Sequence, residues 1–473
     1  MESFFTGLQD VISKLGASVI LPIIIFVMGL ILGAKPGKAF RSGVTIGIAF
    51  VGINLVIGLM WTSLSNVAQA MVTRTGVSLT TVDVGWPSAA AIAFGSSVGT
   101  FVIAIAIVVN LVMLFARLTK TLNIDVWNYW HFAFVGSLVV VVTGSLWMGI
   151  LAAAIAAAFM LLLADWTAPG VQDFYQIPGL SIPHGTSAPF ALLAIPLNWV
   201  LDRIPGINRL KADPETVQEK FGVFGEPVIL GLVIGFVLGL IGFWDSADIR
   251  GSIINVLTTA INLAAVMLLL PRMVQILMEG LIPISEAARE FMHKRFSDRE
   301  VYIGLDSAIL IGHPAAISTA LVLVPITVLL AVILPGNRVL PFADLAVIPF
   351  VVCMFAPITR GNIIRMIIIG TVVIAIGFYV GTAMGPQFTQ AAVDANFQMP
   401  ENATQIISIA DGFSWWPLLV MSLASMAGWI GLLVLLVVVA AMVYFYLRNP
   451  REWERIAGAP QEEAAAPTVA PAK

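Results

Sequence analysis

The sequence predicts an all-α polytopic membrane protein with about eleven transmembrane helices. Of its 473 residues, 59% are hydrophobic and 11% are charged, whereas soluble domains carry about 25% charged residues. Long apolar runs recur along most of the chain, and short polar stretches rich in Gly and Pro separate them. The single cysteine and the four histidines are not at metal-ligand spacing, so we expect no metal and no cofactor.

The apolar runs give the span boundaries, because a helix that crosses a bilayer needs roughly 20 apolar residues. The stretch 131–165 is too long for one span, so we divide it near Gly144-Ser145. The run 344–358 is short enough to be tilted or partly re-entrant. The predicted spans are 16–34, 42–61, 97–117, 131–147, 148–165, 226–243, 252–271, 317–335, 344–358, 363–383 and 417–446.

Basic residues indicate the topology, because cytoplasmic loops carry an excess of Lys and Arg. With the N-terminus outside, eleven spans place 20 of the 24 Lys and Arg residues on the cytoplasmic side. The external loop 384–413 then holds no basic residue. Residues 1–10 hold no Lys or Arg, and the first apolar run has no small-residue cleavage site, so we expect a retained span. The sequence therefore predicts an outside N-terminus and a cytoplasmic C-terminus.

The order of elements repeats along the chain. Gly85-Trp86-Pro87 recurs as Gly312-His313-Pro314, 227 residues later, in the same place between spans. Two units of five spans are inverted relative to each other because five is odd, and inverted repeats with broken helices are typical of transporters. The predicted parts are a first repeat, a cytoplasmic-side connector, a second repeat, an external loop, a C-terminal helix and a disordered tail, at 1–165, 166–225, 226–383, 384–413, 414–447 and 448–473.

A polar stretch between prolines, residues 182–189, is the strongest candidate for a substrate site. It contains His184, Thr186 and Ser187. A histidine can bind a hydroxyl or accept its proton near neutral pH, and the two hydroxyl side chains suit a polyol. The alternative for His184 is a histidine that caps a turn between Pro183 and Gly185.

Asp83 and Asp306 come just before the two Gly-x-Pro breaks. Ionisable groups at membrane depth are costly and usually functional, and a carboxylate accepts paired hydrogen bonds from neighbouring sugar hydroxyls. The alternative for both is a helix N-cap. Trp86 and His313 occupy equivalent places in the breaks. We consider Trp86 either a sugar-stacking ring or an interface aromatic, and His313 a partner of Asp306.

Two further features are candidates of lower weight. Asn54 lies in mid-span between Gly52 and Gly58, which allow close approach. We place it at the substrate site, although such amides often only tie helices together. The segment 127–131 is interpreted mainly as an aromatic belt at the membrane interface, with His131 left as a residue that could face the cavity.

Together these motifs resemble the galactitol family of sugar phosphotransferase-system permeases, the membrane component called enzyme IIC. The resemblance covers residues from about 10 to 380, and the last span matches poorly. The matching stretches are 47–60, 82–87, 123–128 with 130–131, 182–188, 220–222 with 224–228, 302–306 with 312–313, and 334–337 with 339–342 and 344–346.

The resemblance implies a bacterial inner-membrane permease that binds a sugar or polyol, such as galactitol. A phosphorylated IIB protein would transfer phosphate to the substrate at the cytoplasmic side, and the chain itself would not be phosphorylated. Related ascorbate permeases are homodimers in which a core domain moves against a scaffold, an elevator mechanism. There, a His and an Asp at the counterparts of His184 and Asp306 bind substrate. We expect IIB to dock on the basic loops 203–220 and 289–299.

Two other functions remain open from the residues alone. An ion-coupled secondary transporter of a sugar or polyol would use Asp83 or Asp306 as its proton or sodium site. A membrane receptor is disfavoured, because polar motifs within broken helices mark substrate pathways. The chain has no Gly-x-x-x-x-Gly-Lys-Ser/Thr motif, which excludes ATP hydrolysis by that route.

Overall fold

The computed structural model describes residues 17–75, 79–210, 212–216, 226–295, 300–341, 343–399 and 403–460. The start of the first predicted span, the end of the predicted tail and parts of both basic loops therefore lie outside the described residues. Within them, seven helices are long and apolar enough to cross a membrane. The bent pair α4 (Trp86–Gly95) and α5 (Gly99–Phe115) gives an eighth if it counts as one span.

This test finds fewer than the eleven predicted spans, because some of the predicted spans form helices that are too short for it. The first and sixth predicted spans are the shorter helices α2 (Ala17–Ile31) and α10 (Pro227–Phe243). The run 344–358 is broken into η5 (Leu345–Val347), α13 (Ile348–Val352) and α14 (Phe355–Thr359). Prolines at 349 and 357 interrupt this run, since proline removes a backbone donor.

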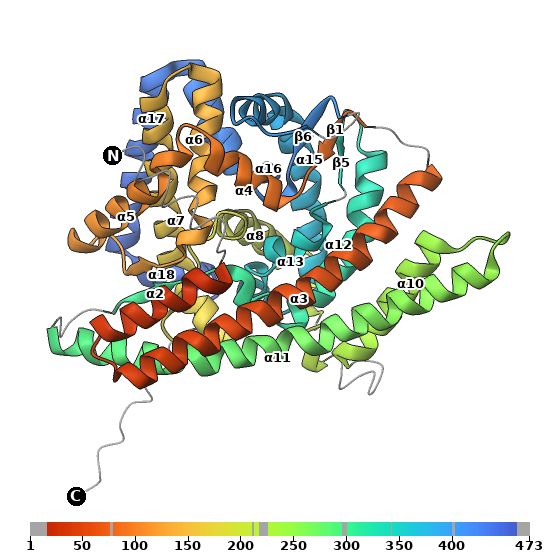
Figure 1. Cartoon of the computed structure of the whole chain (residues 1–473), viewed down its shortest axis with the longest axis horizontal. Coiled ribbons are helices and arrows are strands. Elements are labelled where there is room, and N and C mark those ends of the chain that lie inside the picture. The colour runs from red at the N-terminus through yellow and green to blue at the C-terminus, as the bar shows by residue number, and fades with distance from the viewer. Residues whose placement is uncertain are drawn as a thin grey trace, which may run out of the picture.

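Four helices form a layer of long, tilted rods, which we call the arm (Figure 1). They are α2, α10, α3 (Pro36–Thr75) and α11 (Ile249–Arg295), and α11 packs against the other three. Glycines on α10 make this packing close: a Cβ at Gly235 would lie 2.8 Å from the Ala260 Cα of α11. Such small-residue contacts are usual between membrane helices, because they let backbones approach.

The rest of the chain forms a body above the arm (Figure 1). The predicted division near Gly144-Ser145 is observed: α6 (Trp130–Thr143) ends at Gly144, whose φ is +67°, and α7 (Leu146–Tyr175) begins after Ser145. Ser145 caps α7 by accepting a hydrogen bond from the Met148 amide. The other long helices of the body are α8 (Ala188–Leu201), α12 (Pro314–Ile333), α15 (Ile363–Asp394) and α17 (Trp415–Arg448).

Three predicted boundaries are wrong because helices continue beyond the apolar runs. The connector predicted from residue 166 begins inside α7, and α15 extends into the predicted external loop. The tail predicted from residue 448 begins with α18 (Pro450–Ile456). Trp453 of α18 packs on Trp166 of α7 with ring centroids 4.7 Å apart. Tertiary packing thus stabilises these polar helix ends, although their hydropathy does not predict a helix.

Two small parallel sheets correct the all-α prediction. In one, β1 (Thr81–Asp83) lies between β5 (Val339–Leu340) and β6 (Gln405–Ile407). In the other, β4 (Tyr302–Gly304) lies between β2 (Thr121–Asn123) and β3 (Leu180–Ser181). In each sheet the central strand follows an arm helix of one half of the chain, and the flanking strands come from the other half. Strands this short carry no readable alternation in sequence.

Candidate functional site

A cavity of about 250 Å³ lies where the carboxyl ends of both sheets meet. That size suits a small molecule rather than a peptide. Each of the six strands is followed, within four residues, by a residue that lines the cavity. Broken backbone of this kind is tolerated in a membrane protein where protein or a water-filled cavity covers it. The lining residues that follow the strands include Trp86, Ala343, Ala410, Asp306 and His184.

His184 lies at the end of β3 and is almost fully buried, with 4% of its surface exposed. Its Nε2 is 3.4 Å from an Asp306 carboxylate oxygen and 3.4 Å from the Nε2 of His131. On the other side of the ring, Nδ1 is 3.4 Å from the Ser187 hydroxyl. Ser187 in turn lies 2.6 Å from the hydroxyl of Ser307. His184 therefore connects two walls of the site.

Asp306 follows β4 as Asp125 follows β2, two residues beyond the strand in each case. The side-chain amide of Asn128, on η1 (Val126–Tyr129), donates to both carboxylates, at 2.8 Å to Asp125 and 2.9 Å to Asp306. Asp306 also accepts from the Ala308 amide at 2.8 Å. The parallel pairing of β2 and β4 thus places two acidic groups at one sheet edge, joined by one amide.

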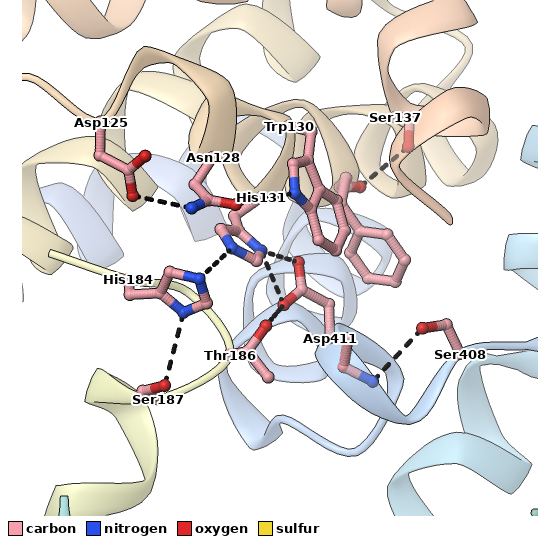
Figure 2. A network of polar contacts seen from close by, with 12 residues as sticks. Asp125, Asn128, Trp130, His131, Ser137, His184, Thr186, Ser187, Ser408 and Asp411 are labelled. Carbon is pink, nitrogen blue, oxygen red and sulfur yellow. Dashed lines mark hydrogen bonds and ion pairs between the residues drawn. The ribbon is translucent and has the colours of Figure 1, made fainter. Parts of the chain in front are cut away.

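His131, at the start of α6, is held by Asp411 of α16 (Ile409–Gly412). Its Nδ1 lies 2.8 Å and 3.0 Å from the two carboxylate oxygens of Asp411 (Figure 2). Thr186 donates to the same carboxylate at 3.3 Å. Gly185 has no side chain at this point, and a Cβ there would lie 2.6 Å from the Cβ and Cγ of His131. The close approach of this loop to α6 therefore requires glycine.

Five of the eight residues predicted for the site line this cavity, and Ser187 lies directly behind it in contact with His184. Asn54 comes from α3, and Trp86 is the first residue of α4. The five lining residues are His184, Thr186, Asp306, Asn54 and Trp86.

Asp83 and His313 lie elsewhere. The carboxylate of Asp83 accepts from the backbone amides of Gly85 at 3.1 Å and Asp344 at 2.7 Å. His313 caps α12 by accepting from the Ala315 amide, and its ring packs on Phe174. The N-cap alternative holds for Asp306, which caps η4 (Ser307–Ile309), and not for Asp83, because Gly85 is the N-cap of α4. Asp83 instead links the loops after β1 and β5. His313 caps its own helix, whereas the sequence predicted it as a partner of Asp306.

Several residues at the site were not among the predicted ones. Asn128 and Trp130 lie in the segment interpreted as an aromatic belt, yet Trp130 is only 2% exposed and its ring centroid is 4.0 Å from that of His131. The belt interpretation is therefore wrong. The signal that marks this segment is Asn123-Ile124-Asp125, a strand end followed by a carboxylate, as in Gly304-Leu305-Asp306. Asp411 has no such local signal.

The charge of the site suits a neutral, hydroxyl-rich ligand. Among the described residues that line the cavity, none is Lys or Arg. The polar groups include one carboxylate, two imidazoles, two amides and a hydroxyl, which bind hydroxyl groups as donors or acceptors. Trp127 and Phe350 add apolar faces. Across the described ranges, no group of three or more His, Cys, Asp or Glu residues is arranged to hold a metal ion.

Comparison with known proteins identifies relatives over most of the chain. The model of a family described as "PTS system sugar-specific permease component" (EIIC-GAT) matches residues 10–402. The "PTS system galactitol-specific EIIC component" of Escherichia coli strain K12 is 42% identical over 391 residues, 83% of this chain and 85% of that protein. Its O157:H7 counterpart matches equally. A "Putative permease IIC component" from strain K12 is 40% identical over 441 residues, 92% of this chain and 98% of that protein.

Proposed function

Because this chain belongs to the EIIC-GAT family of sugar-specific permease components of the phosphotransferase system, we propose that its substrate is galactitol or a closely similar polyol. The observation that carries the proposal is the cavity lined by His184, Thr186 and Asp306, which offers hydroxyl-binding groups and no cationic side chain among its described residues. A chain of hydroxyls can use each of these groups, whereas an anionic sugar would face carboxylates without a counter-ion.

His184 and Asp306 are the central substrate-binding residues in this proposal. They lie 3.4 Å apart, so two adjacent hydroxyls of one polyol can reach both. Thr186, Asn54 and Trp86 complete the lining. Ser187 positions the His184 ring from behind. Asp83 and His313 act at a distance from the ligand, through the backbone segments that they bind.

The fold is an inverted repeat in this proposal. The support is the matching order of the two halves: arm helix α3 leads to the central strand β1, and arm helix α11 leads to the central strand β4. Each central strand pairs with two strands of the other half. Trp86-Pro87 and His313-Pro314 both begin helices, each with proline in the first turn. Two halves related by inversion would exchange strands in this reciprocal way.

Transport by an elevator movement, in a homodimer held together through the arm, is the expected mechanism. The cavity lies at the border of two layers, because Phe50, Asn54 and Ile57 of α3 form one wall and the body forms the others. A movement of the body along the arm would carry His184 and Asp306 past a fixed wall. Substrate would enter from outside and be exposed to a phosphorylated IIB protein in the cytoplasm, docked on the basic loops 203–220 and 289–299, with the chain in the bacterial inner membrane.

Uptake of labelled galactitol by vesicles that contain this chain tests the function. With phosphorylated IIB and its donors, the product inside should be galactitol phosphate, and without them little sugar should accumulate. His184→Ala and Asp306→Ala should abolish this uptake, with protein amounts matched to wild type. Accumulation of free galactitol driven only by a proton or sodium gradient would overturn group translocation and favour the ion-coupled transporter. A polyol other than galactitol as the sole product would change the substrate but not the mechanism.

A further inference from the structure

Five polar side chains contact one another in a continuous line beside the cavity. It begins at Asp411 and passes through His131, His184 and Ser187 to Ser307. Figure 2 shows the first four, with the two imidazole rings edge to face between the carboxylate and the hydroxyl. All five are buried, and the two histidines also line the cavity. Asp411 lies beyond residue 402, where the match to the family model ends.

The carboxylate at one end fixes the direction of every proton on this line. Ionised Asp411 can only accept, so His131 carries its proton on Nδ1 and presents a lone pair on Nε2. The Nε2–H of His184 is 3.4 Å from His131 Nε2 and equally 3.4 Å from an Asp306 oxygen, so it can donate to the carboxylate. His184 accepts from the Ser187 hydroxyl at Nδ1, and Ser187 accepts from Ser307. When His184 donates to Asp306, the lone pair on His131 Nε2 is left to accept a proton from a ligand in the cavity that both histidines line.

We propose that neutral His131, oriented by Asp411, is the general base that accepts the proton of the attacked substrate hydroxyl. This inference rests on the proposed function. The hydroxyl oxygen attacks the phosphoryl group carried by IIB, the bond from phosphorus to the IIB residue breaks, and the hydroxyl proton goes to His131 Nε2. The bond electrons leave with the IIB side chain. Asp411 stabilises the imidazolium, which returns its proton to the medium or to the leaving group after the product departs.

The other basic groups near the cavity are already engaged. Asp306 accepts from Asn128 and from the Ala308 amide, so both of its oxygens already have donors from the protein. His184 Nδ1 faces Ser187, away from His131. The titratable groups that face His131 are His184, Asp306 and Asp411, from three different segments. Asp411 is a positioning residue in this arrangement, because it acts through His131.

Asp411→Asn in the full-length chain, reconstituted in vesicles, separates this role from a structural one. Turnover of galactitol to its phosphate with phosphorylated IIB should fall by at least about 100-fold, the usual contribution of a general base. Affinity for galactitol without IIB should change by less than about threefold. His131→Gln should show the same split, and Asp411→Glu should recover part of the turnover.

Asp165→Asn is the matched control, because Asp165 is a buried carboxylate that holds Thr121 and the Lys120 amide, outside the cavity. It should lower both yield and stability without the split between turnover and affinity. Turnover of Asp411→Asn or His131→Gln within about fivefold of wild type would overturn the inference. Equal losses of affinity and turnover would overturn it as well. Should Asp411→Asn not fold, His131→Gln alone decides. Absence of galactitol phosphate with the wild-type chain would instead contradict the proposed function.

Discussion

At the scale of the residue, buried polar side chains in this protein divide into those that face the cavity and those that hold backbone. Asp306 and Asp83 illustrate the division, because both precede a Gly-x-Pro break in the sequence. Asp306 has an oxygen 3.4 Å from His184 and lines the cavity. Asp83 accepts two backbone amides. Two aspartates that both precede a Gly-x-Pro break thus differ in their surroundings, because Asp306 lines the cavity and Asp83 binds backbone amides.

Asp306→Asn should weaken galactitol binding by at least about tenfold, since a hydrogen bond to a charged group contributes about 1.5–3 kcal/mol. Equilibrium binding of labelled galactitol to purified protein measures this. Asp83→Asn is the control, and its affinity should stay near wild type because Asp83 does not line the cavity. A larger loss of affinity in Asp83→Asn than in Asp306→Asn would contradict this division of roles.

Gly185→Ala should displace His131, because the added Cβ would lie 2.6 Å from the His131 ring carbon and Cβ. We expect lower turnover from a correctly assembled protein, as small misplacements of a reacting group cost up to about 100-fold. The measurement is galactitol phosphorylation at matched protein amounts. Gly37→Ala, at the start of α3, places its Cβ in open space and should leave turnover unchanged. Equal turnover in the two variants would show that the loop around Gly185 can move to accommodate the added methyl group.

At the scale of the element, each short strand positions the broken segment that follows it. Asp83 links two such segments in the sheet of β1, β5 and β6. It joins the Gly85 turn to the loop that holds Asp344, and Asp344 accepts in turn from the Trp86 amide at 2.7 Å. The two carboxylates therefore replace the hydrogen bonds that the broken backbone cannot make with itself.

Asp83→Ala should destabilise the protein, because it leaves two amides without this acceptor. Each such loss costs about 1–3 kcal/mol when the group is buried. Thermal unfolding in detergent should show a lower midpoint. Asp248→Ala, which removes an acceptor from the exposed Gly251 amide, should lower the midpoint less, since water replaces the carboxylate there. Equal shifts for the two variants would mean that the Asp83 contacts are dispensable.

At the scale of the whole molecule, the arm and the body differ in what they contribute. The arm supplies long apolar helices and one wall of the cavity, while the body supplies both sheets and most of the polar side chains. The orientation of the chain in the membrane is predicted from loop charge rather than from this packing.

Single cysteines test that orientation. In a Cys353→Ser background, Gln398→Cys should react with a membrane-impermeant maleimide added to intact cells, and Arg455→Cys should react only after the membrane is opened. Both side chains are exposed, whereas Cys353 is buried, so accessibility reports the side of the membrane. The reverse labelling pattern would place the C-terminus outside and refute the charge-based topology.

The sequence alone identifies the chain as a membrane protein, indicates the family that it resembles, and marks His184, Thr186 and Asp306 as candidate site residues. Hydropathy and local motifs suffice for this, because apolar length and Gly-Pro breaks are properties of short segments. The division at Gly144-Ser145 followed from length alone. Hydropathy failed where contacts, not composition, decide the conformation: α7 continues to Tyr175, and α18 forms within the predicted tail.

Only the tertiary structure decided which polar residues meet. Residues 131, 184, 306 and 411 are separated by tens to hundreds of positions, and they converge because strands from opposite halves pair in parallel. A strand of two or three residues has no sequence signal of its own, since its stability comes from partners distant in the chain. Nor does a lone Asp in the sequence reveal whether it accepts from backbone amides, as Asp83 does, or contacts a histidine, as Asp411 does, because that depends on which neighbour the fold brings within hydrogen-bond distance.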